Sequence, residues 1–374
     1  MTNTIKRLHS EHDQSVWQDD ISRDMLLQGT LKQRIEEVGI RGVTSNPTIF
    51  QKAISVGHAY DEDIRRMLGE DKTPVQVFDA LAIKDIRDAC DLFRPMYDES
   101  NGGDGFVSIE VLPSLARDTE GTVENARMLW RAVDRPNLMV KVPGTVEGAP
   151  AIEQLLSEGI NINVTLLFSL ENYERVARAY VAALKQRDNA GESIDRIASV
   201  ASFFVSRVDT AADKAIDEKI AEGNTDLADL KGKVAVANAR LAYRKFEEIF
   251  LGEEFMVLAE KGAGVQRPLW ASTGTKNPEY SDVLYVETLI GPHTVNTMPW
   301  PTIEAFLDHG TVKRTVDQHY DEAERVLARL EEAGISLDAI TTKLEDDGID
   351  AFAKSYDELL AGVEEKEKAL AAAG

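Results

Sequence analysis

The chain has 374 residues, of which 43% are hydrophobic and 29% charged, and its formal net charge is −23. A surface this acidic repels nucleic-acid phosphates and anionic lipids, which argues against a general nucleic-acid or membrane-surface binder. It leaves room for a small anionic substrate held by a few local cations. No stretch reaches the roughly 18 apolar residues that cross a bilayer, and residues 1–15 lack the apolar core of a signal peptide. We therefore expect a soluble, cytoplasmic globular protein.

Short apolar runs alternate along the chain with longer amphipathic stretches. Eight runs are predicted as strands, at residues 15–19, 42–45, 106–111, 138–143, 161–168, 198–205, 268–273 and 293–298. Helices are predicted after most of them, at residues 122–132, 148–157, 170–186 and 208–250, the last broken near residue 223. Strands alternating with helices indicate parallel βα units, and eight such units close a (β/α)8 barrel. An open doubly wound sheet is the alternative, but no Gly-rich dinucleotide-binding turn follows the first strand.

The tail after the eighth run, residues 300–374, is predicted to be helical throughout. Apolar residues recur at helical spacing over 315–332, and Ser336 is placed to cap a helix over 337–344. A last helix is expected to carry its apolar face on Phe352, Tyr356, Leu359, Leu360 and Val363. We expect residues 1–374 to form one α/β barrel domain, with 300–374 as additional C-terminal helices packed on the barrel.

Motifs for metal or thiol chemistry are weak. The single cysteine, Cys90, falls within a predicted helix and is expected to be a packed, inert thiol. His9 and His12 have the spacing of metal ligands but lie in a polar terminal segment without a carboxylate cluster prepared for zinc. No phosphate-binding P-loop and no Gly-x-Ser-x-Gly turn is present. No metal is expected.

Polar residues in three successive strands occupy the face that should point into the barrel. Side chains of a barrel strand alternate between the interior and the helix layer. In the third, fourth and fifth runs every second residue is apolar, Leu166 among them, and these residues suit the helix layer. The opposite parity carries Glu110, Lys141, Asn163 and Thr165. We therefore expect these four side chains to lie side by side in the barrel interior.

Lys141 is the most informative of these residues. It could simply pair with Glu110 to tie two strands together, or reach solvent at a strand end. Its position near the carboxyl end of a barrel strand, where barrel active sites lie, favours a functional role. Burial favours the neutral amine that a Schiff base requires, and a neighbouring carboxylate can move protons.

Two residues at the ends of the first two strands have competing interpretations. Asp19 shares the parity of Trp17 and would face the mouth of the barrel. A helix from Ser22 needs an N-cap, however, and Asp20 or Ser22 could supply one. Asn46 precedes a proline and could be only a turn or cap residue.

The ordered motifs resemble those of the transaldolase family, Schiff-base barrel enzymes of the non-oxidative pentose phosphate pathway. The matching segments are Val43-Thr-Ser-Asn-Pro-Thr-Ile, Val107-Ser-Ile-Glu-Val, Leu138-Met-Val-Lys-Val-Pro-Gly-Thr, Gly159-Ile-Asn-Ile-Asn-Val-Thr-Leu-Leu-Phe-Ser and Ser202-Phe-Phe-Val-Ser-Arg207. The resemblance runs from about residue 19 to residue 299. The length and the segment Trp270-Ala-Ser-Thr-Gly-Thr-Lys-Asn-Pro are similar to the longer bacterial subfamily.

The resemblance implies roles for individual residues. Lys141 would form the Schiff base, Glu110 would act as acid and base through a water, and Thr165 would help hold that water. Asp19 would take the proton of the donor's C4 hydroxyl. The implied substrate-binding residues are Thr44, Asn46, Asn163, Ser202, Phe204, Ser272 and, at the phosphate, Arg207.

One position departs from the family pattern. Classical short members carry an arginine two residues after the serine that matches Ser272, and this chain has Gly274 there. Lys276 is the obvious substitute cation, so the phosphate geometry and the substrate preference are open.

The activity implied by the resemblance is transfer of a dihydroxyacetone unit from sedoheptulose 7-phosphate to glyceraldehyde 3-phosphate, giving erythrose 4-phosphate and fructose 6-phosphate. The Schiff base is the electron sink, so no cofactor is implied. Two alternatives are a class I aldolase that releases free dihydroxyacetone and a catalytically silent barrel used for binding. The implied partners are sugar phosphates, and a homodimer is compatible with the habit of barrel enzymes.

Overall fold

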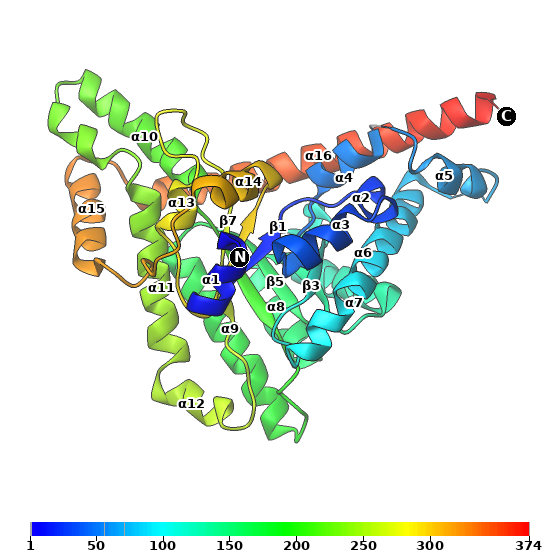
Figure 1. Ribbon diagram of the computed structural model, residues 1–374, viewed down its shortest axis with the longest axis horizontal. Coiled ribbons are helices and arrows are strands. Elements are labelled where there is room, and N and C mark those ends of the chain that lie inside the picture. Colours follow the sequence, from blue (N-terminus) through cyan, green and yellow to red (C-terminus); the bar gives the residue numbers. More distant parts are fainter. Residues whose placement is uncertain (1, 56, 71, 374) are drawn as a thin grey trace.

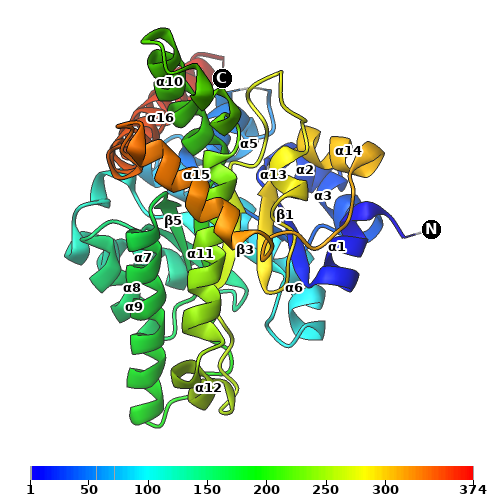
Figure 2. The same ribbon diagram turned by 90° about the vertical axis from the view of Figure 1, so that its left-hand side faces the viewer.

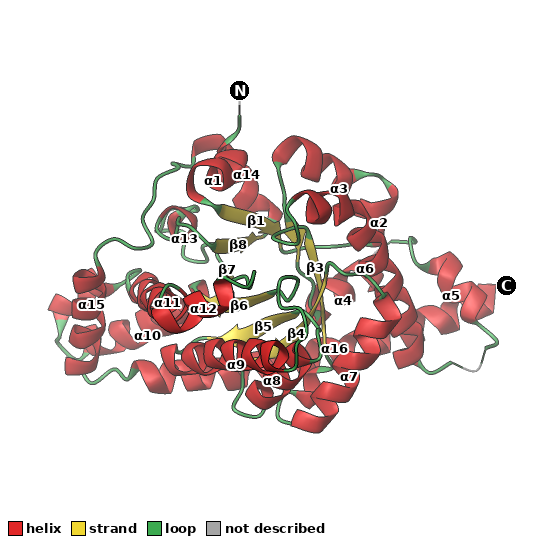
Figure 3. Ribbon diagram, turned by 90° about the horizontal axis from the view of Figure 1, so that it is seen from below, coloured by secondary structure: helices red, strands yellow, loops and turns green. Residues whose placement is uncertain are grey.

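Eight parallel strands close into a barrel in chain order in the computed structural model, which describes residues 2–55, 57–70 and 72–373. Each strand pairs with the next, and β8 pairs with β1. The strands are β1 (Gln14–Gln18), β2 (Gly42–Val43), β3 (Phe106–Glu110), β4 (Leu138–Pro143), β5 (Ile162–Leu167), β6 (Ser199–Phe204), β7 (Arg267–Ala271) and β8 (Thr294–Met298). Figure 3 shows this ring surrounded by helices. The predicted (β/α)8 barrel is confirmed, with every predicted run matched by a strand.

The helices form the outer layer of the barrel (Figure 1). Before β5 they are α1 (Thr4–His12), α2 (Arg23–Leu27), α3 (Thr30–Gln33), η1 (Arg34–Val38), α4 (Pro47–Ser55), α5 (Asp61–Met67), α6 (Pro74–Glu99), η2 (Pro113–Leu115), α7 (Thr119–Val133) and α8 (Gly148–Ser157). After β5 they are α9 (Leu170–Asn189), α10 (Ser206–Ala221), η3 (Thr225–Leu230), α11 (Val234–Phe250), α12 (Glu253–Ala259), α13 (Leu284–Glu287), α14 (Trp300–His309), α15 (Tyr320–Glu332) and α16 (Leu337–Ala373). Within this described part of the chain, no helix has both the length and the apolar character to cross a membrane.

Local sequence signals explain where several helices begin. The side chain of Thr73 accepts a hydrogen bond from the amide of Gln76, whose own side chain accepts from the Thr73 amide, which is a capping box. Ser169 caps α9 in the same way, through the amide of Asn172. The break predicted near residue 223 is confirmed, since α10 ends at Ala221 and α11 begins at Val234.

The C-terminal tail differs from the prediction in two respects. Residues 310–319 are not helical and connect α14 to α15, which packs on α11 (Figure 2). The two helices expected after Ser336 are one continuous helix, α16, because residues 345–351 contain no proline to interrupt it. Ser336 does cap it, accepting a hydrogen bond from the amide of Ala339. In Figure 1, α16 spans the upper end of the barrel from α10 to α5.

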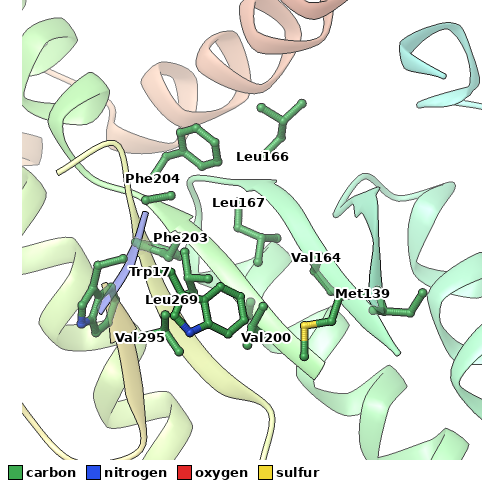
Figure 4. Close-up of a cluster of buried hydrophobic side chains, with 14 of the residues drawn as sticks. Trp17, Met139, Val164, Leu166, Leu167, Val200, Phe203, Phe204, Leu269 and Val295 are labelled. Carbon is green, nitrogen blue, oxygen red and sulfur yellow. The ribbon is translucent and has the colours of Figure 1, made fainter. Parts of the chain in front are cut away.

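Large apolar side chains fill the barrel and the layer between strands and helices (Figure 4). Trp17, Phe203 and Trp270 are fully buried, and the rings of Phe203 and Trp270 meet edge to face with centroids 6.4 Å apart. Leu166 contradicts the predicted alternation. A register shift between β5 and β6 gives it a left-handed backbone with φ of 58°, and its side chain points toward α16 rather than into the strand–helix layer.

A polar cluster closes the opposite, amino-terminal end of the barrel. The buried carboxylate of Asp104 accepts hydrogen bonds from Trp17 Nε1 at 3.0 Å, from Arg41 Nε at 2.6 Å and from the Ser15 hydroxyl. Arg267 donates to the Ser15 hydroxyl at 2.8 Å. These contacts join β1, the residue before β2, β7 and the loop before β3 at the end remote from the expected active site.

Candidate active site

A cavity of about 360 Å³ opens at the carboxyl ends of the strands. This is the end of a (β/α)8 barrel at which active sites are built. Its lining includes every predicted site residue except two: Asp19, Thr44, Asn46, Lys141, Thr165, Ser202, Phe204, Arg207, Ser272 and Lys276. The two exceptions, Glu110 and Asn163, lie directly behind this lining and contact it through hydrogen bonds. The structure thus gathers residues from seven strands and loops around one space.

Lys141 and Glu110 form the buried charged pair of this site. They are register partners on β3 and β4, and Lys141 Nζ lies 3.0 Å from Glu110 Oε2 and 3.0 Å from the carbonyl oxygen of Ser45. The two side chains are 6% and 5% exposed. Burial raises the pKa of Glu110, and the neighbouring Lys141 ammonium opposes that rise. A proton moved from the ammonium to the carboxylate would leave a neutral amine and a neutral acid, which suits Schiff-base formation.

Asp19 lies across the mouth, one residue beyond the end of β1. Its Oδ1 accepts a hydrogen bond of 2.8 Å from the Thr44 hydroxyl, which also lies 2.9 Å from the hydroxyl of Thr297. Its backbone amide donates to the carbonyl of Met298, which fixes the turn. The competing role as a helix cap falls instead to Ser22, whose hydroxyl accepts from the amide of Met25. Asp19 is therefore free to act in the cavity.

Asn46 caps a helix and also lines the cavity. Its Oδ1 accepts a hydrogen bond of 3.0 Å from the amide of Ile49, so it caps α4. It also lines the cavity, at the end of β2. Capping engages the side-chain oxygen and does not use the amide nitrogen.

A hydrogen-bonded row crosses the barrel interior beneath the cavity. The Ser202 hydroxyl donates to Asn163 Oδ1 at 2.7 Å, and Asn163 Nδ2 donates to the Ser108 hydroxyl at 3.0 Å. Asn163 is fully buried, and its side chain positions Ser202 at the cavity wall. The buried hydroxyl of Thr165 has no hydrogen-bond partner among the residues that the structure describes, so it can hold a water or a substrate hydroxyl.

Two cations of the site, Arg207 and Lys276, follow β6 and β7, whereas Lys141 and Lys52 lie on β4 and α4. Arg207 is the second residue of α10, and its guanidinium carbon lies 5.3 Å from the centre of the Phe204 ring. Burial lowers the pKa of Arg207, and the Asp19 carboxylate opposes this. In the described ranges no carboxylate pairs with Arg207, so a ligand anion would supply its missing partner. Lys276 is exposed on the loop after β7, while the hydroxyl of Ser272 is held 2.9 Å from that of Ser206.

Among the lining residues that the sequence analysis did not select as site residues are Thr48, Lys52, Thr297 and Phe352. Thr48 and Lys52 are four residues apart on α4, and this helical spacing after the Asn46 motif could have indicated a shared face. Thr297 could have been found from the parity of β8. No local signal identifies Phe352, because α16 reaches the cavity from a distant part of the chain.

A buried lysine paired with a carboxylate at the carboxyl end of a closed (β/α)8 barrel defines the class of lysine Schiff-base enzymes that make and break carbon–carbon bonds. The family model described as transaldolase/fructose-6-phosphate aldolase matches residues 16–363. Three relatives named transaldolase cover most of both chains. That of Trichodesmium erythraeum is 48% identical over 96% of this chain and 96% of its own length. That of Thermobifida fusca is 51% identical over 92% and 94%, and that of Mycobacterium bovis 47% identical over 92% and 92%. The chain belongs to the transaldolase/fructose-6-phosphate aldolase family.

Proposed function

We propose that this protein is a transaldolase, which transfers a dihydroxyacetone unit from sedoheptulose 7-phosphate to glyceraldehyde 3-phosphate. The observation that carries this proposal is the buried Lys141–Glu110 pair, with Asp19 facing the same cavity, in a chain that matches transaldolases over nearly its whole length. The products are erythrose 4-phosphate and fructose 6-phosphate.

The geometry supports a sequence of proton transfers around Lys141. Its neutral amine attacks C2 of the ketose, and Glu110 supplies and removes protons, through a water, while the C2 oxygen leaves as water. Asp19 then takes the proton of the C4 hydroxyl, the C3–C4 bond breaks, and the aldehyde departs. The electron pair moves into the protonated imine and forms an enamine. In the second half the enamine carbon attacks the acceptor aldehyde, and Asp19 returns the proton. Water then hydrolyses the product imine, which releases the new ketose and restores the Lys141 amine.

Neighbouring side chains support these steps. The hydrogen bond from Thr44 fixes the orientation of the Asp19 carboxylate. Asn163 sets Ser202 at the wall, where a hydroxyl of the dihydroxyacetone unit would lie, and Asn46 faces the same unit. We infer that the Thr165 hydroxyl binds the water used by Glu110.

The substrate phosphate is assigned to the β6 and β7 side of the mouth. The guanidinium of Arg207 lies against the Phe204 ring and can bind a phosphate through two parallel hydrogen bonds. Arg207 is the second residue of α10, and the amino end of a helix attracts anions. Lys276 stands beside it in place of the arginine missing at position 274. Two local cations thus allow a protein with a net charge of −23 to bind an anionic sugar.

We also infer that residues 300–374 belong to the same domain as the barrel. The support is that α16 contributes Phe352 to the cavity and contacts α4, α6, α10 and β5. A tail that completes the lining would have to fold with the barrel.

Two measurements test the proposed function. Purified protein is incubated with fructose 6-phosphate and borohydride, and intact mass should show one reduced dihydroxyacetone adduct. A coupled assay with fructose 6-phosphate and erythrose 4-phosphate should then show acceptor-dependent release of glyceraldehyde 3-phosphate. Absence of the adduct would identify a silent binding barrel. Turnover that does not depend on the acceptor, with free dihydroxyacetone as product, would identify an aldolase.

A further inference from the structure

Phe352 is the residue through which the C-terminal helix enters the active site. It lines the cavity, is 6% exposed, and the centre of its ring lies 5.9 Å from Lys141 Nζ. Among the described residues that line the cavity, it alone comes from α16. An apolar ring therefore lies near the nitrogen that would carry the reaction intermediate.

The helix that carries Phe352 is fixed to the barrel on both sides of the mouth. On one side the Thr48 hydroxyl donates to that of Ser355 at 2.8 Å. On the other side Asn172 Nδ2 donates to Glu345 at 2.6 Å. These contacts bracket residue 352 and hold its ring in one place.

A glycine lets the same helix approach the rim closely. A methyl group added at Gly348 would lie 3.0 Å from Leu166 Cδ2 and 3.9 Å from a guanidinium nitrogen of Arg207. Leu166 is the side chain that the left-handed backbone of β5 turns toward α16. The irregular end of β5 at Leu166 and the small residue Gly348 together allow α16 to pack closely against the cavity.

The intermediate on Lys141 has two fates that differ only in what reaches it. In transfer, the enamine carbon forms a bond to the carbonyl carbon of the acceptor, the acceptor oxygen takes a proton, and water then hydrolyses the product imine and restores the lysine amine. In release, the enamine carbon takes a proton from water, and a second water then hydrolyses the imine. This frees dihydroxyacetone and restores the lysine amine. Neither route requires an oxidant or a reductant, and both end with hydrolysis of an imine, so access of water to the enamine carbon decides between them.

We propose that Phe352 determines this partition, by occupying the space beside Lys141 from which water would protonate the enamine carbon. A phenyl ring neither donates nor accepts a proton, and its apolar edge gives water no hydrogen-bond partner. The acceptor aldehyde is assigned to the part of the cavity that Arg207 and Ser272 line. The inference rests on the proposed transaldolase function and specifies which residue separates that activity from simple aldol cleavage.

The test measures dihydroxyacetone released per fructose 6-phosphate cleaved, at saturating erythrose 4-phosphate. Phe352→Ala removes the ring and should raise this ratio by about tenfold or more, which corresponds to a change of about 1.4 kcal/mol in relative barriers. Phe352→Leu keeps an apolar side chain of similar reach and should stay within about threefold of the wild type. Leucine keeps the apolar bulk but removes the aromatic ring. The two variants therefore distinguish exclusion of water from an attraction between the ring and the Lys141 nitrogen.

The matched control is Leu359→Ala. Leu359 is equally well buried on the same helix but does not line the cavity, so its truncation should lower stability and leave the release ratio unchanged. A Phe352→Ala protein that still forms the borohydride adduct but keeps the wild-type ratio overturns the inference. If that variant does not fold, the same criterion is applied to Phe352→Val. Absence of the adduct in the wild type would overturn the proposed function instead, so the two failures are distinguishable.

Discussion

Lys141 and Glu110 lie opposite each other on adjacent strands, with Nζ and Oε2 3.0 Å apart and both side chains buried. Such a pair could only tie β3 to β4, or it could exchange a proton during catalysis. A buried ion pair by itself is weak evidence for either, because desolvation offsets much of its attraction. Variants that keep the charge but change the chemistry decide between the two.

Lys141→Arg should abolish both the borohydride adduct and turnover. A guanidinium keeps the positive charge beside Glu110 but cannot form an imine. The adduct is located by peptide mass spectrometry, and we expect Lys141 to be the only modified lysine. Trapping at another lysine, or an active arginine variant, would show that the assignment is wrong.

Glu110→Gln and Asp19→Asn should block different steps. Glu110→Gln should slow formation of the adduct, whereas Asp19→Asn should still form it and fail to cleave the C3–C4 bond. Loss of a general acid or base costs about 10²–10⁴-fold in rate. Rapid-quench trapping, compared with steady-state turnover, separates the two steps.

Asp20→Asn is the matched control for Asp19. Asp20 lines a neighbouring surface pocket rather than the cavity, and burial raises its pKa. We expect the Asp20 variant to remain active. A damaging Asp20→Asn with a mild Asp19→Asn would reverse the assignment.

Arg207→Ala should raise the Michaelis constant for fructose 6-phosphate strongly, and Lys276→Ala should raise it more moderately. A hydrogen bond to a charged group contributes ~1.5–3 kcal/mol, so roughly ten- to over a hundredfold is expected for the arginine. The comparison substrate is unphosphorylated fructose, for which a phosphate contact has no effect. If Lys276→Ala impairs both substrates equally, Lys276 supports its loop and does not bind phosphate.

Asp79→Asn should stabilise the protein more at about pH 8 than at about pH 5. Burial raises the pKa of Asp79 to about 6, above its value in the unfolded chain. Because the folded state holds this proton more tightly, the aspartate stabilises the fold at low pH. That contribution is lost as pH rises through about 6, while asparagine is insensitive to pH. Urea unfolding of both proteins at the two pH values measures the difference, and a constant difference would contradict the prediction.

Asp104→Asn should destabilise the barrel without changing the active site. Asp104 is buried and pairs with Arg41 at 2.6 Å at the amino-terminal end, so its loss leaves a partly buried arginine without its partner. We expect a cost of about 3 kcal/mol in urea unfolding. The borohydride adduct at Lys141 should still form under native conditions. Glu11→Gln breaks an exposed pair with Arg7 and should have no measurable effect, which makes it the control.

The alternation of side chains in the strands made much of the candidate site predictable. Glu110, Lys141 and Asn163 were placed on one interior face from parity alone, and the structure confirms that they are neighbours. Parity failed at Leu166, because a register shift, which has no signature in the side chains, interrupts the alternation. The alternation also could not show that Asn163 lies behind the cavity wall, because the depth of a residue along the barrel axis depends on the stagger of the strands.

The sequence by itself determined the elements of this protein, because hydrophobic periodicity and helix caps are properties of neighbouring residues. It therefore predicted the eight strands, the barrel and the polar residues at the strand ends. Only the tertiary structure decided which distant segment covers the site. Phe352 lies 211 positions after Lys141 in the sequence, and its ring reaches the cavity because α16 runs across the mouth between α10 and α4. Such a contact depends on the direction of a whole helix, which is set by packing against many elements at once rather than by any local pattern.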